Sequence, residues 1–397
     1  MERDIIILGC GISGMLTALG LAKNNINSTI IEKKSIKDLT NPDDPRTTAL
    51  NDSSKHYMEK IDIWQTLQEH CQNINDIYVC QNMNDNMFHM TSEGIELGRM
   101  IENNILRRSL FRLVKDNKHI TLITDAEYKD LNLENGYVQL NVEKHSKDNN
   151  NQILSTKTPY KATLCIAADG KFSEARKSFF HNQFEKNYGQ KALAFNIKHE
   201  LNHEGGAIEH FLPRGPFATL PLKSGYESSI VWTEDDEFAA FLEKLSQERV
   251  EDQIYKLTGG ALGKVKISTP IKSFPLSAHV VEKYHEKMLA LIADSAHCIH
   301  PLAGQGINMG IGDVICLVDL ITEHMSLGLK IDENMLVKYE QKRKRDNIIM
   351  FRVTDIINNI FTSKSKIINM LSSSGLSLLE QFPFIKNILI NYAKGIK

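Results

Sequence analysis

The sequence predicts an α/β fold with two kinds of sheet, one buried and parallel, the other mostly antiparallel. A strand, a glycine turn, a helix and a second strand follow one another within residues 5–32. Two more continuous apolar strands, at 162–168 and 288–293, each lead into an aspartate, which is typical of buried parallel strands. Between them, residues 192–233 hold strand-like pieces separated by glycine and proline, which indicates an antiparallel sheet in a second domain.

Length and composition limit the class of protein. The 397 residues suffice for one large α/β domain and a smaller one. With 47 Lys and Arg against 49 Asp and Glu, the charge gives no reason to expect nucleic-acid binding. The six cysteines show no C-x-x-C spacing, which favours free thiols over disulfides or zinc. The uncharged run 5–22 contains glycines and lacks the basic start of a secretory signal, so we expect a cytoplasmic protein without a transmembrane helix.

The first motif lies between the first strand and its helix, where Gly9, Gly11 and Gly14 form a G-x-G-x-x-G pattern. The first glycine permits the tight turn, the second lets a pyrophosphate approach the backbone, and the third allows close helix packing. The phosphates then lie at the helix N-terminus, whose N–H groups and dipole favour negative charge. Glu32 closes the second strand 23 positions after Gly9, near the place of an acid that bonds ribose hydroxyls. This order of elements predicts a dinucleotide site.

Helical spacing of apolar residues predicts further helices at 55–70 and 101–114. Residues 144–157 are charged and rich in asparagine, and we expect them to form a loop. After Gly304 the chain turns helical, and from Glu333 it is expected to be largely helical, with basic and apolar faces.

Two further motifs follow the other buried strands. Residues 169–176 read DGKFSEAR and residues 293–308 read ADSAHCIHPLAGQGIN. Together with PRTTAL at 45–50 and GPFATLP at 215–221, they resemble the aromatic-ring flavin monooxygenases, the para-hydroxybenzoate hydroxylase superfamily. The segment HPLAGQG at 300–306 is closer still to the branch of ubiquinone-biosynthesis hydroxylases. The resemblance covers most of the chain, from residue 5 to the helix after Asn308.

The resemblance implies FAD as the cofactor and NAD(P)H as a transient co-substrate with no second Rossmann domain of its own. It implies a Rossmann-type FAD-binding domain made of discontinuous segments, with an inserted, mostly antiparallel β-sheet substrate domain that covers the reactive face of the flavin. The expected division is 1–75, 99–180 and 285–332 for the FAD-binding domain, 76–98 and 181–284 for the substrate domain, and 333–397 for a C-terminal helical region.

The implied cofactor site gathers residues from most of the chain. Asp169 and Arg176 serve the pyrophosphate side, and Arg46 and Arg107 also contact the cofactor. Arg107 has alternatives in the adjacent Arg108 and in Asn103. No catalytic side chain is evident from the sequence, and the flavin-facing loop is expected at Pro301, Gly304, Gln305 and Gly306. The set expected to bind the cofactor is Gly9, Gly11, Gly14, Glu32, Arg46, Arg107, Asp169, Gly170, Arg176, Asp294, Gly304, Gly306 and Asn308.

Physical reasoning agrees with this assignment at Asp294 and at the helix after Gly304. An acid at the end of a buried strand suits a hydrogen bond to a ribityl hydroxyl at the carboxyl edge of a sheet. A helix N-terminus beside the flavin stabilises the anion that forms when the flavin takes a hydride. The sequence departs from the family at Ala293, where glycine is usual, and the methyl group fits if the backbone there is ordinary β. Asp313 is expected on the following helix, where its loss affects flavin binding far less than the loss of Asp294.

The activity implied by the resemblance is hydroxylation of an electron-rich phenol ring. NAD(P)H reduces FAD, O2 supplies the oxygen, and the protein orients the substrate and excludes water. The expected substrate is a polyprenylated phenol, an apolar quinone precursor of the ubiquinone pathway. Two alternatives stay open: another FAD-dependent oxidoreductase of the same fold, such as a reductase or halogenase, and a flavin-binding scaffold subunit of a quinone-biosynthesis complex. The lysine-bearing signature of the halogenases is not evident, which weakens that option.

Two other patterns have a structural and a functional interpretation. Asp294, His297 and His300 recur every three residues, but Pro301 argues against the helix that would make them metal ligands, so we expect no metal. Residues 342–345 read KRKR on an expected helix, with apolar residues from 348 onward. This helix either packs on the FAD domain with a solvated basic face or makes peripheral contact with the inner face of an anionic membrane.

Overall fold

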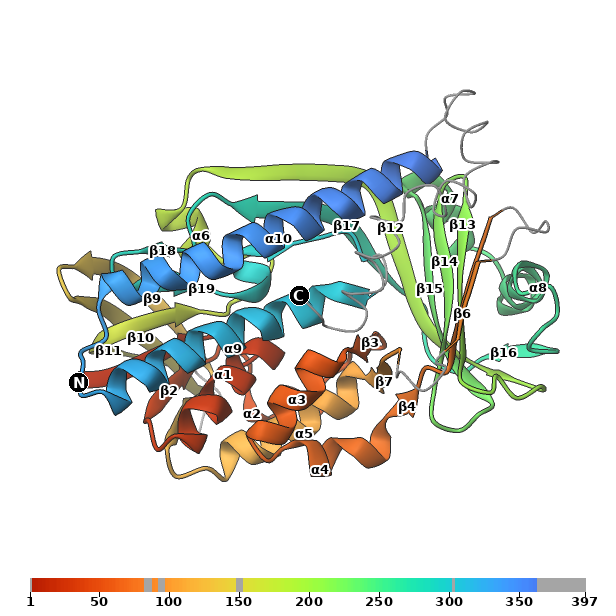
Figure 1. The fold of residues 1–397 in the computed structure, drawn as a ribbon. Helices are drawn as coiled ribbons and strands as arrows, with labels where there is room; N and C mark the ends of the chain where they lie inside the picture. The colour runs from red at the N-terminus through yellow and green to blue at the C-terminus, as the bar shows by residue number, and fades with distance from the viewer. Residues whose placement is uncertain (1, 82–87, 92–96, 148–152, 302–303, 363–397) are drawn as a thin grey trace.

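The computed structural model describes residues 2–81, 88–91, 97–147, 153–301 and 304–362. The chain has a mixed α/β fold with two large sheets at opposite ends of the molecule and a small sheet between them (Figure 1). Long helices lie along the first sheet, and two short helices cover the far side of the second.

The first sheet has a parallel centre. Its strands are β1 (Glu2–Leu8), β2 (Ser28–Ile31), β8 (Ile120–Ile123), β9 (Ala126–Glu134), β10 (Tyr137–Lys147), β11 (Ile153–Ala167), β18 (His285–Glu286) and β19 (Leu289–Leu291). The parallel strands lie in the order β19-β11-β1-β2-β8. Three antiparallel strands extend this centre, with β18 beside β19 and the β9–β10 pair beside β11.

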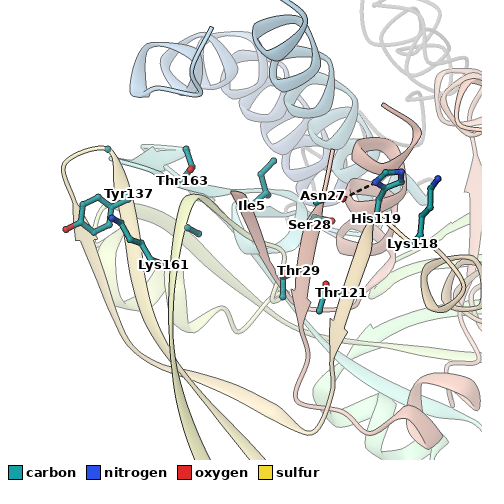
Figure 2. Close-up of a pocket in the computed structure, with 12 residues that line it drawn as sticks. Ile5, Asn27, Ser28, Thr29, Lys118, His119, Thr121, Tyr137, Lys161 and Thr163 are labelled. Carbon is teal, nitrogen blue, oxygen red and sulfur yellow. Dashed lines mark hydrogen bonds between the residues drawn. The ribbon is translucent and has the colours of Figure 1, made fainter. Parts of the chain in front are cut away.

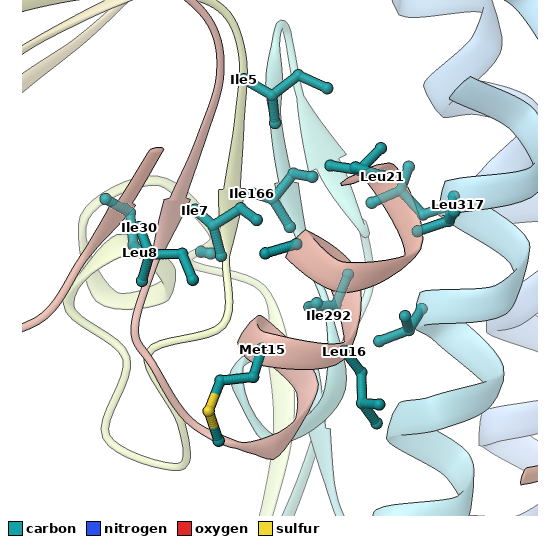
Figure 3. Close-up of a cluster of buried hydrophobic side chains, with 14 of the residues drawn as sticks. Ile5, Ile7, Leu8, Met15, Leu16, Leu21, Ile30, Ile166, Ile292 and Leu317 are labelled. Carbon is teal, nitrogen blue, oxygen red and sulfur yellow. The ribbon is translucent and has the colours of Figure 1, made fainter. Parts of the chain in front are cut away.

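The helices of this part are α1 (Ile12–Lys23), α2 (Ile36–Thr40), α3 (Asp52–Lys60), α4 (Trp64–Leu67), α5 (Asn103–Lys115), α6 (Glu174–Phe179), α9 (Gln305–Ser326) and α10 (Glu333–Thr362), with the 3-10 turns η1 (Gln68–His70) and η2 (Ala293–Ser295). Because a parallel strand is covered on both faces, residues 5–8 of β1 are apolar without alternation and almost completely buried. Figure 3 shows the side chains of Ile5, Ile7 and Leu8 in one cluster with Leu16 of α1, Ile166 of β11 and Leu317 of α9. The helix α9 is long and apolar enough to cross a membrane, but most of it is buried as a core helix.

The second sheet is antiparallel except where β5 pairs with β13. Its strands are β5 (Asp76–Gln81), β6 (Phe88–Thr91), β12 (Gln183–His199), β13 (Gly206–Leu212), β14 (Gly215–Pro221), β15 (Glu227–Asp235), β16 (Val265–Ile267), β17 (Lys272–Val281) and β20 (His297–Cys298). Side chains alternate between its two faces. Phe195, Phe217 and Trp232 pack on the outer face with α7 (Asp236–Leu242) and α8 (Gln247–Leu257).

The opposite, inner face of this sheet looks toward the rest of the molecule. The Nδ2 atom of Asn196, on the inner face, donates to Oε2 of Glu102 at 3.2 Å. Glu102 ends β7 (Arg99–Glu102), which forms the small third sheet with β3 (Thr47–Leu50) and β4 (Gln72–Asn73). The third sheet therefore contacts the inner face of the antiparallel sheet.

Two predictions about elements were wrong. The helix expected at 55–70 is divided into α3, α4 and η1, because Asp62 adopts a left-handed φ of 59° that ends the first helix. Residues 144–157 were expected to form a loop. Their described part instead forms the ends of β10 and β11, on either side of residues 148–152, which lie outside the described part. The polar side chains at 144–145 and 155–157 stay exposed on the paired strands, so composition alone did not reveal the strands. The helical region expected at 333–397 is α10 as far as Thr362, and its remainder lies outside the described residues.

Candidate functional site

The glycine turn has the geometry that its motif predicts. Gly9 has a φ of 101°, and a Cβ atom there would lie 2.5 Å from the carbonyl oxygen of Ala168 in the next loop. A Cβ atom on Gly14 would lie 2.1 Å from the carbonyl oxygen of Gly9, so this glycine lets α1 approach the strand. A Cβ atom on Gly11 would meet no atom within 4 Å. Open space therefore faces the N-terminus of α1, where a phosphate would be stabilised.

Glu32 closes this turn from the end of β2. Its two carboxylate oxygens accept hydrogen bonds from the backbone N–H groups of Cys10, at 2.7 Å, and Lys34, at 2.8 Å. The carboxylate is buried beside a small hollow at the end of α1. This hollow is lined by Cys10, Met15, Lys34, Asp38, Leu39, Pro42, Arg107 and Phe111.

A buried acid that the sequence did not single out holds the two expected arginines. Asp44 forms a two-bond pair with Arg46, with both N–O distances at 2.7 Å, and its Oδ2 lies 3.7 Å from Nε of Arg107. Burial favours a raised pKa for Asp44, but the hydrogen bonds and charge of Arg46, with the charge of Arg107, lower it. Of the alternatives to Arg107, Arg108 is exposed and Asn103 accepts a 2.6 Å hydrogen bond from Thr48. Arg107 is the one of the three that lines the hollow.

The two aspartate motifs meet through Arg176. Its guanidinium donates to the carbonyl oxygens of Lys171 at 2.6 Å, Ser295 at 3.0 Å and Asp294 at 3.4 Å. Asp169 accepts hydrogen bonds on Oδ2 from the hydroxyl of Tyr128 and from the backbone at the start of α6. Its other oxygen, Oδ1, is buried and has no hydrogen-bond partner within the described part of the chain. Gly170, with a φ of 82°, leaves open space beside it.

Asp294 projects from η2 with its side chain exposed. The surrounding protein nevertheless raises the pKa of its carboxyl, against the opposing charges of His297, Arg46 and Lys171. An exposed side chain whose carboxyl pKa is nevertheless raised by surrounding protein lies in a recess rather than on an outer surface.

The expectation of ordinary β backbone at Ala293 was wrong. Ala293 has a left-handed φ of 53°, which is unfavourable for a residue with a Cβ atom. Its methyl group has room only because α9 carries a glycine opposite it: a Cβ atom on Gly310 would lie 2.7 Å from the Ala293 Cβ.

The start of α9 provides a second open helix N-terminus. Gly304 caps the helix with a φ of 62°, and a Cβ atom there would lie 3.7 Å from that of Ala49. A Cβ atom on Gly306 would meet nothing within 4 Å. Asn308 has a structural role, because it donates to the carbonyl of Ala49 at 2.7 Å and accepts from the Ser54 hydroxyl at 2.8 Å. Gln305 is buried and Pro301 half-buried, while residues 302–303 lie outside the described part.

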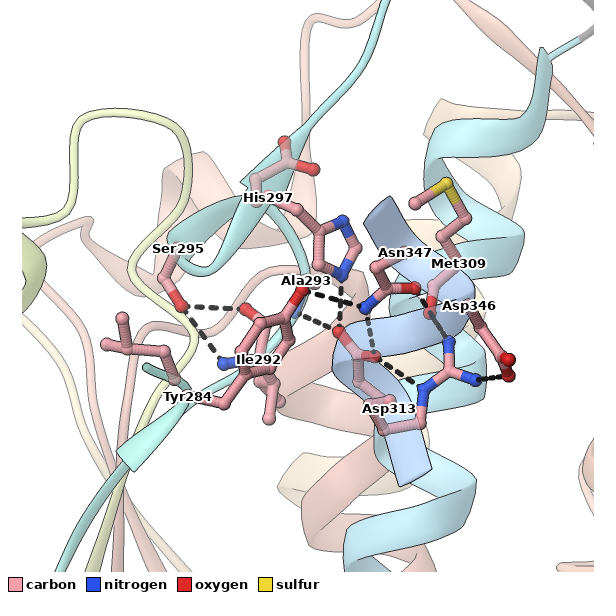
Figure 4. Close-up of polar contacts among 12 residues, drawn as sticks. Tyr284, Ile292, Ala293, Ser295, His297, Met309, Asp313, Asp346 and Asn347 are labelled. Atoms are coloured by element: carbon pink, nitrogen blue, oxygen red, sulfur yellow. Dashed lines mark hydrogen bonds and ion pairs between the residues drawn. The ribbon is translucent and has the colours of Figure 1, made fainter. Parts of the chain in front are cut away.

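A buried network behind η2 was missed by the sequence analysis. The Oδ2 atom of Asp313 accepts from the backbone N–H of Ala293 at 2.9 Å and lies 2.5 Å from Nε2 of His297 (Figure 4). Its Oδ1 accepts from Nε of Arg343 at 2.7 Å and from Asn347 at 3.0 Å. Burial opposes ionisation, but the charges of His297 and Arg343 hold the pKa of Asp313 below its ordinary value.

This network corrects the interpretation of the KRKR segment. Arg343 is buried against Asp313, so it is unavailable to a membrane. His297 likewise points into the network, and among the described residues no group of three His, Cys, Asp or Glu side chains is placed to hold a metal ion.

A second hollow lies away from these residues, beside the amino ends of β2 and β8 (Figure 2). It is open and polar, and a ring nitrogen of His119 lies 2.9 Å from the side-chain oxygen of Asn27 at its rim. The residues of the sequence motifs do not reach it.

Comparison with known proteins decides the family. A family model described as an FAD binding domain matches residues 2–348. The chain belongs to this FAD-binding family. Its curated relatives include "Ubiquinone hydroxylase UbiL" of Rhodospirillum rubrum, 29% identical over 99% of this chain and 89% of the relative. They also include "3-demethoxyubiquinol 3-hydroxylase" of Escherichia coli, 26% identical over 99% of this chain and 98% of the relative.

Solved structures share the fold. The p-nitrophenol 4-monooxygenase PnpA of Pseudomonas putida superposes with a TM-score of 0.77 at 14% identity, covering 99% of this chain and 98% of the other. These findings confirm three predictions: the family resemblance, FAD as the cofactor and the monooxygenase class.

Proposed function

We propose that this FAD-binding protein hydroxylates the aromatic ring of a polyprenylated phenol in ubiquinone biosynthesis, with NAD(P)H and O2 as co-substrates. The names of the two curated relatives described above support the substrate class, because each similarity runs through nearly the whole chain. When bound, FAD takes a hydride from NAD(P)H and, with O2, supplies the oxygen atom that enters the ring.

The arrangement of this chain's residues fits a dinucleotide flavin. We assign the adenosine ribose to Glu32 and the pyrophosphate to the open N-terminus of α1 at Gly11, near Arg107 and Asp169. Oδ1 of Asp169 and Nε of Arg107 are buried polar atoms without a hydrogen bond in the described part of the chain, of the kind that a bound cofactor satisfies. Asp294, exposed in its recess, is assigned to the ribityl chain, and Arg176 holds the backbone that carries it.

The observation that carries the proposal is the meeting of this cluster with the inner face of the antiparallel sheet. The guanidinium of Arg46 lies 4.8 Å from the ring centroid of Phe274 in β17, while the same side chain is paired with Asp44. A substrate held on the inner face would therefore lie next to the cofactor. We propose that this sheet is the inserted substrate domain and that the parallel sheet belongs to a Rossmann-type domain, divided at the boundaries predicted above.

Two parts of the protein would support this chemistry in different ways. The N-terminus of α9 at Gly306 faces open space and would stabilise negative charge on the reduced flavin ring. The apolar inner face would orient the phenol and exclude water, so that reducing equivalents enter product rather than free peroxide.

Turnover with a candidate phenol tests the proposal. Purified, yellow protein should oxidise NAD(P)H faster when a short-chain prenylated phenol is present, and the product should gain one oxygen atom from labelled O2. Phenol-independent oxidation without oxygen in a product would indicate a reductase, halide incorporation a halogenase, and no turnover a scaffold subunit. The quinone precursor that accumulates in cells lacking the protein would identify the ring position.

We also propose that the protein works in the cytoplasm at the inner face of the membrane, because a polyprenyl phenol is too apolar to be free in water. Within the KRKR segment of α10, Lys342 and Arg345 are exposed and available for such contact.

A further inference from the structure

One acidic side chain lies in an apolar row on the inner face of the antiparallel sheet. Strand pairing aligns Glu209 of β13 with Val79 of β5 on one side and with Ala218 of β14 on the other. The row continues to Val231 of β15 and Ala194 of β12. Directly paired residues share a face, so Glu209 is the one ionisable member of this row between β5 and β12. At the next strand, β17, Ala194 pairs with Lys272, whose ammonium group forms an ion pair with Asp43.

The neighbours of Glu209 along its own strand fix where this row lies. Ala207, two residues earlier on the same face, packs in a cluster with Ala49 of β3, whose Cβ lies 3.7 Å from the Cβ position at Gly304. Phe211, two residues later, packs against Ile357 of α10. Glu209 therefore lies between the α9 N-terminal loop and α10, on the face that meets Arg46.

The carboxylate of Glu209 has no hydrogen-bond or ion-pair partner among the side chains that the structure describes. It is half-buried, yet the surrounding protein alone raises its pKa to about 7. As at Asp294, this combination marks a side chain in a recess rather than on the outer surface. An acid kept in an apolar row without a partner lowers stability, so a ligand that satisfies it would explain its presence.

We propose that Glu209 accepts the hydrogen bond of the phenolic hydroxyl in the substrate and takes its proton as the ring is attacked. This inference rests on the proposed function. The O–H bond of the phenol breaks, its electron pair stays on the ring oxygen, and the proton forms a new O–H bond on the carboxylate, to be lost to water when product leaves. The electron-rich ring oxygen then directs the oxygen atom to the ring, while Glu209 fixes which edge of the ring is presented.

A matched pair of ligands tests this contact directly. An ortho-prenyl phenol and its methyl ether differ only in the hydroxyl proton, and binding of both to the FAD-loaded protein is measured through the flavin absorbance. The wild type should bind the phenol about ten- to a hundredfold more tightly than the ether. In Glu209→Gln this preference should fall severalfold or more, while FAD content and thermal midpoint stay at least equal to those of the wild type.

Glu234→Gln is the matched control. Glu234 is a second acid of the same sheet whose pKa burial raises to about 7, but it lies on the outer face, where it accepts a 2.9 Å hydrogen bond from Trp232. This variant should keep the preference for the phenol.

The pH dependence gives an independent readout. Phenol affinity in the wild type should rise with pH through about 7 as Glu209 ionises, and this rise should disappear in Glu209→Gln. Few other groups near Glu209 titrate in this pH range. The neighbouring strand β14 has no ionisable residue, and the thiol pKa of Cys80 on β5 is raised to about 11. His210 points to the outer face of the sheet. On α10, Arg352 is exposed and Asp355 is paired with a lysine of β12.

The outcomes separate the two proposals. If the wild type and Glu209→Gln prefer the phenol over the ether equally, the role of Glu209 is overturned and the proposed function is not. A wild type that neither prefers nor hydroxylates the phenol would overturn the proposed function and this inference with it.

Discussion

The Nε2 atom of His297 lies 2.5 Å from Oδ2 of Asp313, and both side chains are at most 2% exposed. This pair joins β20 to α9. Arg343 of α10 donates a hydrogen bond to the other carboxylate oxygen of Asp313. Because Asp313 also accepts the backbone N–H of Ala293, the turn that presents Asp294 is held from behind. Asp313 is therefore on the expected helix, but it is coupled to the candidate site.

We expect Asp313→Asn to lower the free energy of unfolding by about 3–5 kcal/mol, since it leaves the buried Arg343 without its acid. Urea titration of the holoprotein measures this. The control is Asp319→Asn on the same helix, which removes an exposed pair with Lys60 and should cost less than about 1 kcal/mol. Small, equal losses in both variants would contradict the importance of the network.

Gly310→Ala should destabilise the protein by about 1–3 kcal/mol, because the new methyl group would overlap that of Ala293. Adding Ala293→Gly removes the overlap and the left-handed alanine together, so the double variant should recover most of the loss. Thermal unfolding of the two single variants and the double variant measures the coupling. Strictly additive effects would show that these residues do not share the space.

The glycines of the first turn should separate into two classes. Gly11→Ala adds a methyl group to open space at a φ of −74°, so we expect an unchanged apoprotein stability but at least tenfold weaker FAD binding. Gly14→Ala, its control, should instead destabilise the fold itself, because the new atom would lie 2.1 Å from a carbonyl oxygen. FAD titration and apoprotein melting distinguish them, and full FAD affinity in Gly11→Ala would remove the phosphate assignment.

Glu209 should make stability depend on pH. Its pKa is about 7 in the folded protein and roughly 4.3 when unfolded, so the unfolded state loses this proton first as pH rises. The raised pKa therefore lowers stability progressively between about pH 4.3 and 7, and the loss persists above that range. Glu209→Gln should be more stable than the wild type at pH 8, by on the order of 2 kcal/mol, and similar to it at pH 4. A difference that is the same at both values would exclude this origin.

Neutralising Lys342 and Arg345 should weaken binding to anionic vesicles at low salt, by roughly fivefold for each charge if both reach the surface. Co-sedimentation measures it, with Lys198→Gln/Lys266→Gln, two exposed lysines of the antiparallel sheet, as the control pair. Equal binding by both double variants would rule out α10 as the contact.

The parts predicted most closely from sequence are those with strong local signals. The second strand was predicted to be closed by Glu32, and β2 ends at Ile31, because an apolar run ends at an acid after a glycine turn and a helix. The spacing of the glycines also predicted that Gly11 faces open space and that Gly14 is closely packed. The break at Asp62 was missed because a left-handed aspartate leaves no distinct pattern among polar helix residues.

Other features depend on residues distant in the chain. Nothing near Asp313 indicates that Arg343 will approach it from another helix, and Asp44 gains its role only when α5 brings Arg107 to it. Glu209 reads as an ordinary polar residue of an alternating strand, since its isolation depends on small side chains supplied by four other strands. Buried polar partners are chosen by tertiary packing, and sequence spacing carries little information about it.

The strand order also affects how the chain is made. β11, which pairs with β1, is completed about 160 residues after β1 along the chain, and β19, beside β11, about 280 residues after it. During that interval the edge of β1 that pairs with β11 has no native partner, which exposes a nascent chain to wrong pairing. Because Asp294 and α9 follow β19, a complete cradle for the cofactor exists only once α9 has been synthesised. We expect the protein to acquire FAD after translation rather than during it, and to depend on chaperones in the meantime.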